Sequence, residues 1–463
     1  MDFPKDFTQN EIVFRLYSII FLFFGAVPLT AASSKVEIDW DSSKWQLGIT
    51  AQKAPLSTVL GEIQRATDWE ILMESGIDRP VTVNMRKRDV TDCLKHLLQP
   101  LRFELKRMPG APTQLAVYRR GIESADAPVP ETVPEPKKIM TELVISVRSE
   151  SEAQRLARQF NADLANFVKL IGAARLIFRD GDQAASARVG LAGQVRYVDD
   201  VYEYPRPRSP VLVAGGVLPV RVKPTVKMGD DSLVIALVDT GVQSEYMDKP
   251  QFILEGKSVK EDAGKPSRAP LHGTAMASVM LRGLSNKDLD VNESNVRIQP
   301  IDVFGGQNNR TTSYDVAAGI AMAIESGADI INLSLGGPTS THVVKQVLQE
   351  GHRRGILIIG AAGNEPVTAP TYPAAFSEVM AVTATDLKGN LASYANRGNF
   401  VDVAEIGRQP VRYNGRTYAI NGTSPATAYI SGMAAALMSK YDKSVLETRE
   451  MIIKNRPFVP PNE

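Results

Sequence analysis

Cysteine is almost absent from this sequence: Cys93 is the only one among 463 residues. One cysteine excludes an intramolecular disulfide framework and a zinc site built from several thiolates, and we expect Cys93 to be a small buried apolar residue. A charge excess is absent too, since 53 lysines and arginines face 52 acids and leave a net charge of +1. Proteins that bind nucleic acid through a basic field need a larger excess of cations. The composition therefore argues against a nucleic-acid partner.

Histidine is scarce, and the full set is His96, His272, His342 and His352. His342 and His352 belong to one polar helical stretch, and His96 lies in the N-terminal part of the chain. Only His272 is followed by Gly-Thr and surrounded by small residues, at the start of a predicted helix. His272 is therefore the candidate for an imidazole that acts as a general base.

One long apolar run lies near the N-terminus, from Leu16 to Leu29. Arg15 precedes it, and the small residues Thr30 and Ala32 fit the rule for signal-peptide cleavage. The run is too short for an ordinary membrane span. Residues 1–32 are therefore predicted to be a secretory signal peptide, and the protein to be exported to the periplasm or the extracellular space. Acids outnumber bases ahead of the run, which leaves a later start or an uncleaved anchor as alternatives.

A chain of this length is expected to form two or three domains. Residues 35–120 give a mixed α+β pattern without any catalytic spacing, so this unit is predicted to bind or dock. Helices are predicted at 56–67 and 90–98, and strands at 69–73, 81–85, 103–106 and 115–118. Segments 54–60 and 90–94 resemble the short N-terminal domain shared by secretins and TonB-dependent receptors. That resemblance implies the envelope of a Gram-negative-type bacterium and a protein partner there.

A proline-rich acidic stretch at 121–138 is predicted to be an extended linker. Residues 139–205 then follow a β-α-β-β-α-β order, for which a ferredoxin-like binding domain is the general interpretation. The strands are predicted at 140–147, 168–171, 174–178 and 195–198, and the helices at 151–160 and 184–191. Residues 204–210 form a polar, proline-rich junction at which cleavage could occur.

The rest of the chain alternates apolar strands with helices. Strands are predicted at 233–238, 296–303, 330–335, 356–359 and 379–384, and helices at 313–326 and 343–353. Asn414-Gly415 within residues 412–420 predicts a β-hairpin. Continuous apolar strands separated by helices predict a buried parallel sheet covered on both faces. The predicted fold class is therefore α/β, a doubly wound, mostly parallel sheet preceded by two small α+β domains.

Four polar residues stand where such a sheet binds ligands, at the carboxyl ends of its strands. Asp239 directly follows a strand, so its carboxylate can hold one tautomer of an imidazole, which His272 offers. Asn364 follows Gly363 and other small residues that allow a ligand to approach the backbone closely. Its amide can donate to an oxyanion together with the backbone N–H of Ser424. Ser424 lies between a Gly-Thr turn and a helix start, which makes it the candidate nucleophile.

These residues and their neighbours resemble the subtilisin-like serine proteases, or subtilases, across residues 206–456. The motifs, in the family's order, are Val-Asp-Thr-Gly (238–241), His-Gly-Thr (272–274), Ala-Ala-Gly-Asn (361–364) and Gly-Thr-Ser-x-Ala (422–426). The resemblance implies a serine endopeptidase in which His272 accepts the Ser424 proton, Asp239 stabilises the imidazolium and an acyl-enzyme forms. It also implies that residues 139–205 are a propeptide removed by self-cleavage. The residues expected to bind the substrate backbone are Ser334, Leu335, Gly336 and Gly363.

The sequence departs from the family pattern at three places. Ala275 stands where a second histidine is common, Pro425 where methionine is usual, and Ala428-Tyr429 where Pro-His is usual. None of these changes removes a catalytic atom, and proline in a first helical turn loses no needed N–H. We therefore expect them to alter the shape of the substrate pocket.

Three alternatives accompany these assignments. Ser424 could be a helix cap, and Asn364 a turn residue. A cluster in the loop after the His272 helix resembles a calcium loop, and subtilases often bind calcium: Asp288, Asp290, Asn292 and Glu293. Glu293 stands where an EF-hand loop needs glycine, so a solvated acidic loop is the alternative to a calcium site. No cofactor is required for the predicted reaction.

The predicted function is an exported serine endopeptidase that acts on proteins or peptides and is made as a self-processed zymogen. The alternative is a cell-envelope adaptor that binds a partner through residues 35–120 and carries a weak or vestigial protease domain.

Overall fold

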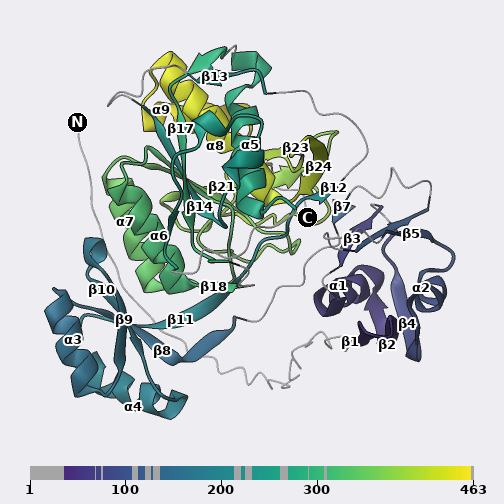
Figure 1. Cartoon of the computed structure of the whole chain (residues 1–463), viewed down its shortest axis with the longest axis horizontal. Coiled ribbons are helices and arrows are strands. Elements are labelled where there is room, and N and C mark those ends of the chain that lie inside the picture. The colour runs from purple at the N-terminus through teal and green to yellow at the C-terminus, as the bar shows by residue number, and fades with distance from the viewer. Residues whose placement is uncertain are drawn as a thin grey trace, which may run out of the picture.

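The computed structural model describes residues 36–67, 69–74, 77–106, 113–119, 127–128, 136–212, 220–224, 232–260, 269–289, 291–306 and 310–459. Figure 1 shows three units that follow one another along the chain, from purple through blue to green and yellow. The predicted signal peptide at 1–32 and most of the predicted linker at 121–138 lie outside the described residues. Among the described residues, no helix has the length and apolar character needed to cross a membrane.

The first unit contains two small sheets and two helices. Its strands pair in the orders β1-β2-β4 and β5-β6-β3-β7. The elements are β1 (Val36–Asp41), β2 (Gln46–Pro55), α1 (Leu56–Thr67), β3 (Glu70–Met73), β4 (Pro80–Asp89), α2 (Val90–Leu98), β5 (Arg102–Lys106), β6 (Gln114–Tyr118) and β7 (Ala127–Pro128). Cys93 is fully buried, and burial raises the pKa of its thiol to about 11. It is therefore the buried apolar residue that we expected.

Two features of this unit differ from the prediction. The predicted elements begin at residue 56, whereas β1 and β2 precede them as an antiparallel pair. Residues 127–128 of the predicted linker form β7, which pairs with β3 at the edge of its sheet. An edge strand tolerates proline because its outer N–H groups have no ladder partner.

The second unit has the order β-α-β-β-α-β, with strands arranged as β11-β8-β10-β9. Its elements are β8 (Lys138–Ser146), α3 (Glu150–Gln159), β9 (Asp163–Val168), the 3-10 turn η2 (Lys169–Ile171), β10 (Ala173–Ile177), α4 (Gly181–Ala192) and β11 (Val198–Pro205).

Two predicted strands of this unit are wrong in position. The predicted strand at 168–171 is a 3-10 turn that ends at Gly172 in a left-handed conformation, and the strand precedes it. The last strand covers 198–205 instead of 195–198. The N–H of Val195 donates to the Leu191 carbonyl at 3.1 Å, so this apolar residue lies in the turn that follows α4 and not in a strand.

The third unit is built on a seven-stranded sheet in which all neighbours run parallel, in the order β15-β17-β14-β19-β20-β21-β22. These strands are β14 (Val234–Asp239), β15 (Lys257–Ser258), β17 (Arg297–Asp302), β19 (Ile330–Leu333), β20 (Leu357–Ala361), β21 (Val379–Thr385) and β22 (Val403–Ile406). The helices are α5 (His272–Leu284), α6 (Ser313–Glu325), α7 (His342–Arg353), α8 (Thr423–Tyr441) and α9 (Val445–Asn455).

The two faces of this sheet belong to different hydrophobic clusters. Ile235 and Leu237 of β14 pack with α5 and α8, whereas Ala236 and Val238 pack with α6 and α7. This alternation is what a sheet buried on both faces requires. The predicted α/β class with a parallel sheet is confirmed.

Short elements complete the third unit. They are β12 (Val211–Leu212), β13 (Lys223–Pro224), η3 (Ser244–Tyr246), η4 (Pro250–Phe252), η5 (Lys287–Leu289), β16 (Glu293–Ser294), β18 (Arg310–Thr312), β23 (Arg408–Tyr413) and β24 (Arg416–Asn421). β23 and β24 form the predicted hairpin, and both turn residues, Asn414 and Gly415, have positive φ. A two-residue turn of this kind matches the twist of the paired strands.

The second unit packs on the face of the sheet that α6 and α7 cover (Figure 1). Val144 of β8 and Val201 of β11 belong to the same buried cluster as the helices. The end of β11 leaves its own sheet and pairs with β18, with Glu203 opposite Thr312 and Pro205 opposite Arg310. The two units therefore meet in one buried cluster, and β18 of the third unit extends the sheet of the second unit at its β11 edge.

Helices α5 and α8 touch backbone to backbone on the other face. A Cβ placed on Gly432 of α8 would lie 1.9 Å from the Met280 carbonyl oxygen of α5. A Cβ on Gly283 of α5 would lie 2.1 Å from the Tyr429 carbonyl oxygen of α8. Glycine allows this approach, which brings the C-terminal half of α5 against the middle of α8.

Candidate active site

Asp239 is the last residue of β14 and is fully buried at the carboxyl edge of the sheet. Both of its carboxylate oxygens lie 2.8 Å from Nδ1 of His272, and Oδ1 also accepts the Thr240 N–H at 2.6 Å. A carboxylate in this position holds the proton on Nδ1 and leaves Nε2 as the basic nitrogen.

His272 is the first residue of α5, and its side chain is 3% exposed. The next residue must be glycine, because a Cβ on Gly273 would lie 2.1 Å from the Thr240 carbonyl oxygen. The Gly273 N–H donates to the Thr240 hydroxyl at 2.8 Å. The first turn of α5 is thus held directly against the residue that follows Asp239.

Ser424 is the second residue of α8, after Gly422 at the N-cap with φ of 147°. The serine does not cap the helix, so that alternative is wrong. Its hydroxyl donates to the carbonyl oxygen of Ser334 at 3.1 Å, and the Ser334 hydroxyl donates back to the Ser424 carbonyl at 3.2 Å. The side chain lies in the same cleft as the imidazole of His272.

Asn364 follows β20 and lines this cleft as well. Its Oδ1 accepts the Thr423 backbone N–H at 2.9 Å and the Thr423 hydroxyl at 3.3 Å. The side chain therefore bonds to the residue next to Ser424, far along the chain, and not to a local turn. With the amide oxygen engaged, the NH2 group is the donor left for a ligand.

The predicted site residues other than Asp239 lie together in one cleft, and Asp239 lies behind His272. The lining includes all four residues predicted to bind the substrate backbone: Ser334, Leu335, Gly336 and Gly363. It also includes residues 205–208 of the chain itself, which continue from β11. Arg206 donates to the Gly306 carbonyl at 2.9 Å and lies over the Phe304 ring, and burial lowers the pKa of its guanidinium.

Sequence reasoning missed two parts of this region. The first is β18, which pairs with the segment that enters the cleft. The β-branched residues Thr311 and Thr312, directly before a helix, are the local signal that could have indicated this strand. The second is Asn396, which lies in a loop distant in sequence and bonds to the residues before and after Asn364. No motif or periodicity in the sequence around Asn396 indicates these contacts.

The acidic cluster considered for calcium is only partly described. Asp288 lies in η5 and Glu293 in β16, whereas Asp290 lies outside the described residues. Over the ranges that the structure describes, no group of three or more histidines, cysteines or acids is arranged to hold a metal ion.

The chain is similar to known proteases over its third unit. Residues 230–456 match the model of the subtilase family. Thermitase of Thermoactinomyces vulgaris is 34% identical over 209 residues, which cover 44% of this chain and 75% of thermitase. Subtilisin DY of Bacillus licheniformis is 30% identical over 213 residues, which cover 45% of this chain and 77% of that protein.

A likeness among solved structures concerns the fold. Fervidolysin of Fervidobacterium pennivorans, described as a keratinolytic enzyme related to subtilisin, superposes with a TM-score of 0.53 at 18% identity. The alignment covers 70% of this chain and 58% of that one. Together with the sequence matches, these similarities establish that the chain belongs to the subtilase family and is a serine-type endopeptidase.

Proposed function

We propose that this protein is an exported endopeptidase made as a zymogen, in which Asp239, His272 and Ser424 form the catalytic triad. Residues 139–205 are its propeptide, and the chain cleaves itself within residues 204–210. The amide of Asn364 and the N–H of Ser424 form the oxyanion hole. Export rests on the apolar run at Leu16 to Leu29.

The observation that carries this proposal is the position of the chain's own junction in the cleft. Glu203 to Pro205 pair with β18 in the way an extended substrate adds to a sheet edge. Tyr204 is 2% exposed, so this part of the junction is firmly seated. Residues 205–208 then line the same cleft as His272, Ser424 and Asn364. A segment bound in this manner both blocks the cleft and presents itself for cleavage.

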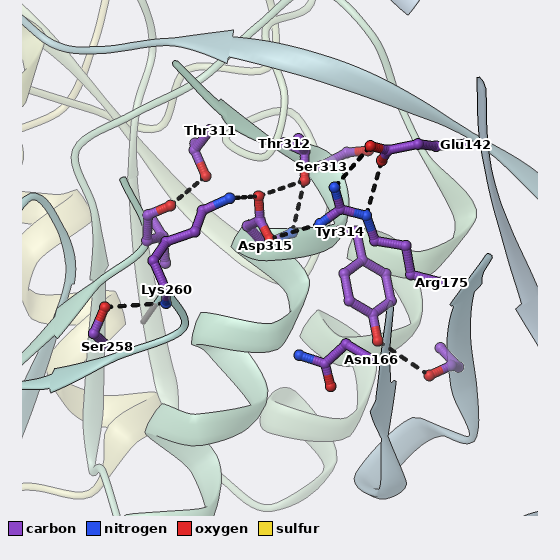
Figure 2. A network of polar contacts seen from close by, with 12 residues as sticks. Glu142, Asn166, Arg175, Ser258, Lys260, Thr311, Thr312, Ser313, Tyr314 and Asp315 are labelled. Atoms are coloured by element: carbon purple, nitrogen blue, oxygen red, sulfur yellow. Dashed lines mark hydrogen bonds and ion pairs between the residues drawn. The ribbon is translucent and has the colours of Figure 1, made fainter. Parts of the chain in front are cut away.

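A buried polar network ties the second unit to the protease unit, as Figure 2 shows. Arg175 of β10 makes two hydrogen bonds of 2.8 Å to Glu142 of β8 and lies 3.2 Å from Asp315 of α6. Asp315 also accepts from Lys260 and, at 2.7 Å, from Thr312. The Arg175 guanidinium thus links one carboxylate of each unit.

A second set of contacts involves the start of α7. Asp199 of β11 accepts the Val343 N–H at 2.9 Å, which places a carboxylate at the positive end of the helix. Tyr197 packs against His342, with the rings tilted by 45° and their centroids 4.3 Å apart, and its hydroxyl donates to Gln346 at 2.9 Å. These contacts support a tightly held inhibitory unit that remains bound after a single cut in the junction.

The proposed reaction assigns one role to each residue of the site. His272, held by Asp239, takes the proton of the Ser424 hydroxyl through Nε2, and Oγ attacks the peptide carbonyl carbon. The hydroxyl must first rotate away from Ser334, which a bound substrate would favour. The amide of Asn364 and the Ser424 N–H stabilise the oxyanion. His272 then protonates the leaving amine, and water hydrolyses the acyl-enzyme.

Mass analysis of the purified wild-type chain tests this proposal. We expect fragments that end within residues 204–210 and an N-terminus that begins after residue 32. Two observations made together would contradict both the proposed self-processing and the proposed triad. They are a chain that stays intact and added protein substrates that stay uncut under the same conditions.

Substituting Arg175 should shorten the delay before activity appears. Arg175→Met leaves Glu142 and Asp315 without their shared cation, and removing one partner of a buried ion pair costs about 3–5 kcal/mol. Because about 1.4 kcal/mol is a factor of ten, we expect the lag in peptide hydrolysis to fall at least about tenfold. The matched control is Arg179→Met, since Arg179 bonds Asp180 at 3.1 Å but its side chain is 86% exposed. An equal lag in both variants would show that this network does not hold the second unit on the protease unit.

We further propose that residues 35–120 dock to an envelope protein, on the basis of the resemblance of segments 54–60 and 90–94. The test is capture of envelope proteins by the full chain carrying Ser424→Ala. The comparison is the same chain with Leu94→Asp, which places a charge in the core of the first unit, where Leu94 is fully buried. Recovery of the same proteins by this variant would count against the docking role.

A further inference from the structure

The loop that carries Asn364 is held from the side of the nucleophile. The Gly363 N–H donates to the Thr423 hydroxyl at 3.1 Å, and Asn364 itself accepts from the Thr423 N–H. These bonds join the loop to the first turn of α8, which contains Ser424. These bonds hold only the side of the loop that faces α8. The opposite side needs contacts of its own.

Asn396 holds the other side of the loop. Its side chain is fully buried, and its amide nitrogen lies 2.9 Å from the Ala362 carbonyl oxygen. Its Oδ1 accepts the Glu365 N–H at 2.8 Å, and its own backbone N–H donates to the Gly363 carbonyl at 3.1 Å. Asn396 therefore bonds to the residues before and after Asn364 in the chain.

Further bonds fix Asn396 itself. The Thr383 hydroxyl, on β21, donates to its carbonyl oxygen at 2.6 Å. The amide nitrogen also lies 2.9 Å from the Thr371 hydroxyl and 2.9 Å from a carboxylate oxygen of Glu365. A residue tied to an interior strand of the sheet, with β20 and β22 on either side, is a rigid support for the loop that it contacts.

The shape of the loop is fitted to this residue. Gly363 has φ of 108°, and a Cβ on it would lie 2.4 Å from the Asn396 amide nitrogen. The glycine in Ala-Ala-Gly-Asn is thus required by contact with Asn396 as well as by its backbone conformation. Asn396 is not among the residues that line the cleft, so it acts through the loop.

We infer that Asn396 is a positioning residue that sets the orientation of the Asn364 amide in the oxyanion hole. The inference rests on the proposed role of Asn364. An oxyanion donor must lie close to where charge develops in the transition state, and it contributes little to binding of the ground state. A loop displaced by a fraction of an ångström should therefore lower kcat and leave KM nearly unchanged.

A double-mutant cycle on the full, self-processing chain tests the inference. We expect Asn396→Ala to lower kcat by roughly 10- to 100-fold, with KM changed less than about threefold. Asn364→Ala should lower kcat by about 100- to 1000-fold, which is the known effect of removing the oxyanion-hole asparagine of subtilisin, a member of the same family. The double variant should then resemble Asn364→Ala alone within about threefold, because the positioned group is gone.

The outcomes separate the inference from the proposed site. Multiplicative losses in the double variant, or an unchanged kcat in Asn396→Ala, overturn the positioning role. An unchanged kcat in Asn364→Ala overturns the proposed oxyanion donor instead. The control is Asn286→Ala, which removes a buried asparagine that contacts Asp288 and Met433 and does not line the cleft. It should lower thermal stability without lowering kcat.

A second variant keeps the inference testable if Asn396→Ala does not fold. Thr383→Val keeps nearly the volume of a fully buried side chain outside the cleft and removes the hydroxyl that donates to the Asn396 carbonyl oxygen. We expect a smaller fall in kcat, about 3- to 10-fold, that again disappears in the Asn364→Ala background. A fall that persists in that background contradicts the inference.

Discussion

Ser424→Ala should abolish both self-cleavage and peptide hydrolysis, and the chain should accumulate with the junction intact. The hydroxyl is the atom that would bond to the substrate carbonyl, and the rest of the site provides only positioning and charge stabilisation. Loss of the nucleophilic serine in subtilisin itself lowers kcat by about 10⁶, which sets the scale for a member of this family. Gel analysis and initial rates on an unstructured protein substrate measure both effects.

The control for this prediction is Ser278→Ala. Ser278 lies on α5 and donates to the Thr274 carbonyl at 3.0 Å, so it is another helical serine that does not line the cleft. Its substitution should leave processing and rate unchanged. Residual processing in Ser424→Ala at a rate close to wild type would mean that the nucleophile lies elsewhere.

Gly432→Val should prevent the protease unit from folding. The added Cβ would meet the Met280 carbonyl oxygen at 1.9 Å, and the Leu284 N at 2.8 Å, and both atoms are backbone of a buried helix. Neither can shift without moving α5, which carries His272. Overpacking of a core usually costs about 1–3 kcal/mol, and a backbone clash belongs to the rarer class above about 4 kcal/mol.

Thermal unfolding of the Ser424→Ala chain, with and without the glycine change, measures this effect without self-digestion. Gly193→Ala is the control, because nothing lies within 4 Å of a Cβ at that position. It should change stability by less than about 0.5 kcal/mol. Unchanged unfolding in Gly432→Val would show that α5 and α8 do not pack as described.

The parallel sheet was predictable because its strands are continuous apolar runs and its helices end in clear signals. The closeness of Asp239, His272, Asn364 and Ser424 was predictable because each lies near the end of a strand or the start of a helix at the same edge of the sheet. Local sequence determines which end of an element a residue occupies, and parallel strands bring those ends together.

The features that were missed depend on contacts between distant segments. β11 continues to Pro205 only because β18 supplies a partner more than 100 residues away. Asn396 is polar and fully buried, and its burial is satisfied by groups on three other segments. Neither partner is visible in local periodicity, since pairing across the fold follows from tertiary packing.

The proposed triad is tested most directly by labelling the self-processed protein with a fluorophosphonate, which reacts with serines that a histidine activates. We expect one adduct per chain, located on the peptide that contains Ser424, and loss of that adduct in His272→Ala. The triad would be contradicted if the wild-type protein took up no label. It would also be contradicted if the adduct on Ser424 were unchanged in His272→Ala.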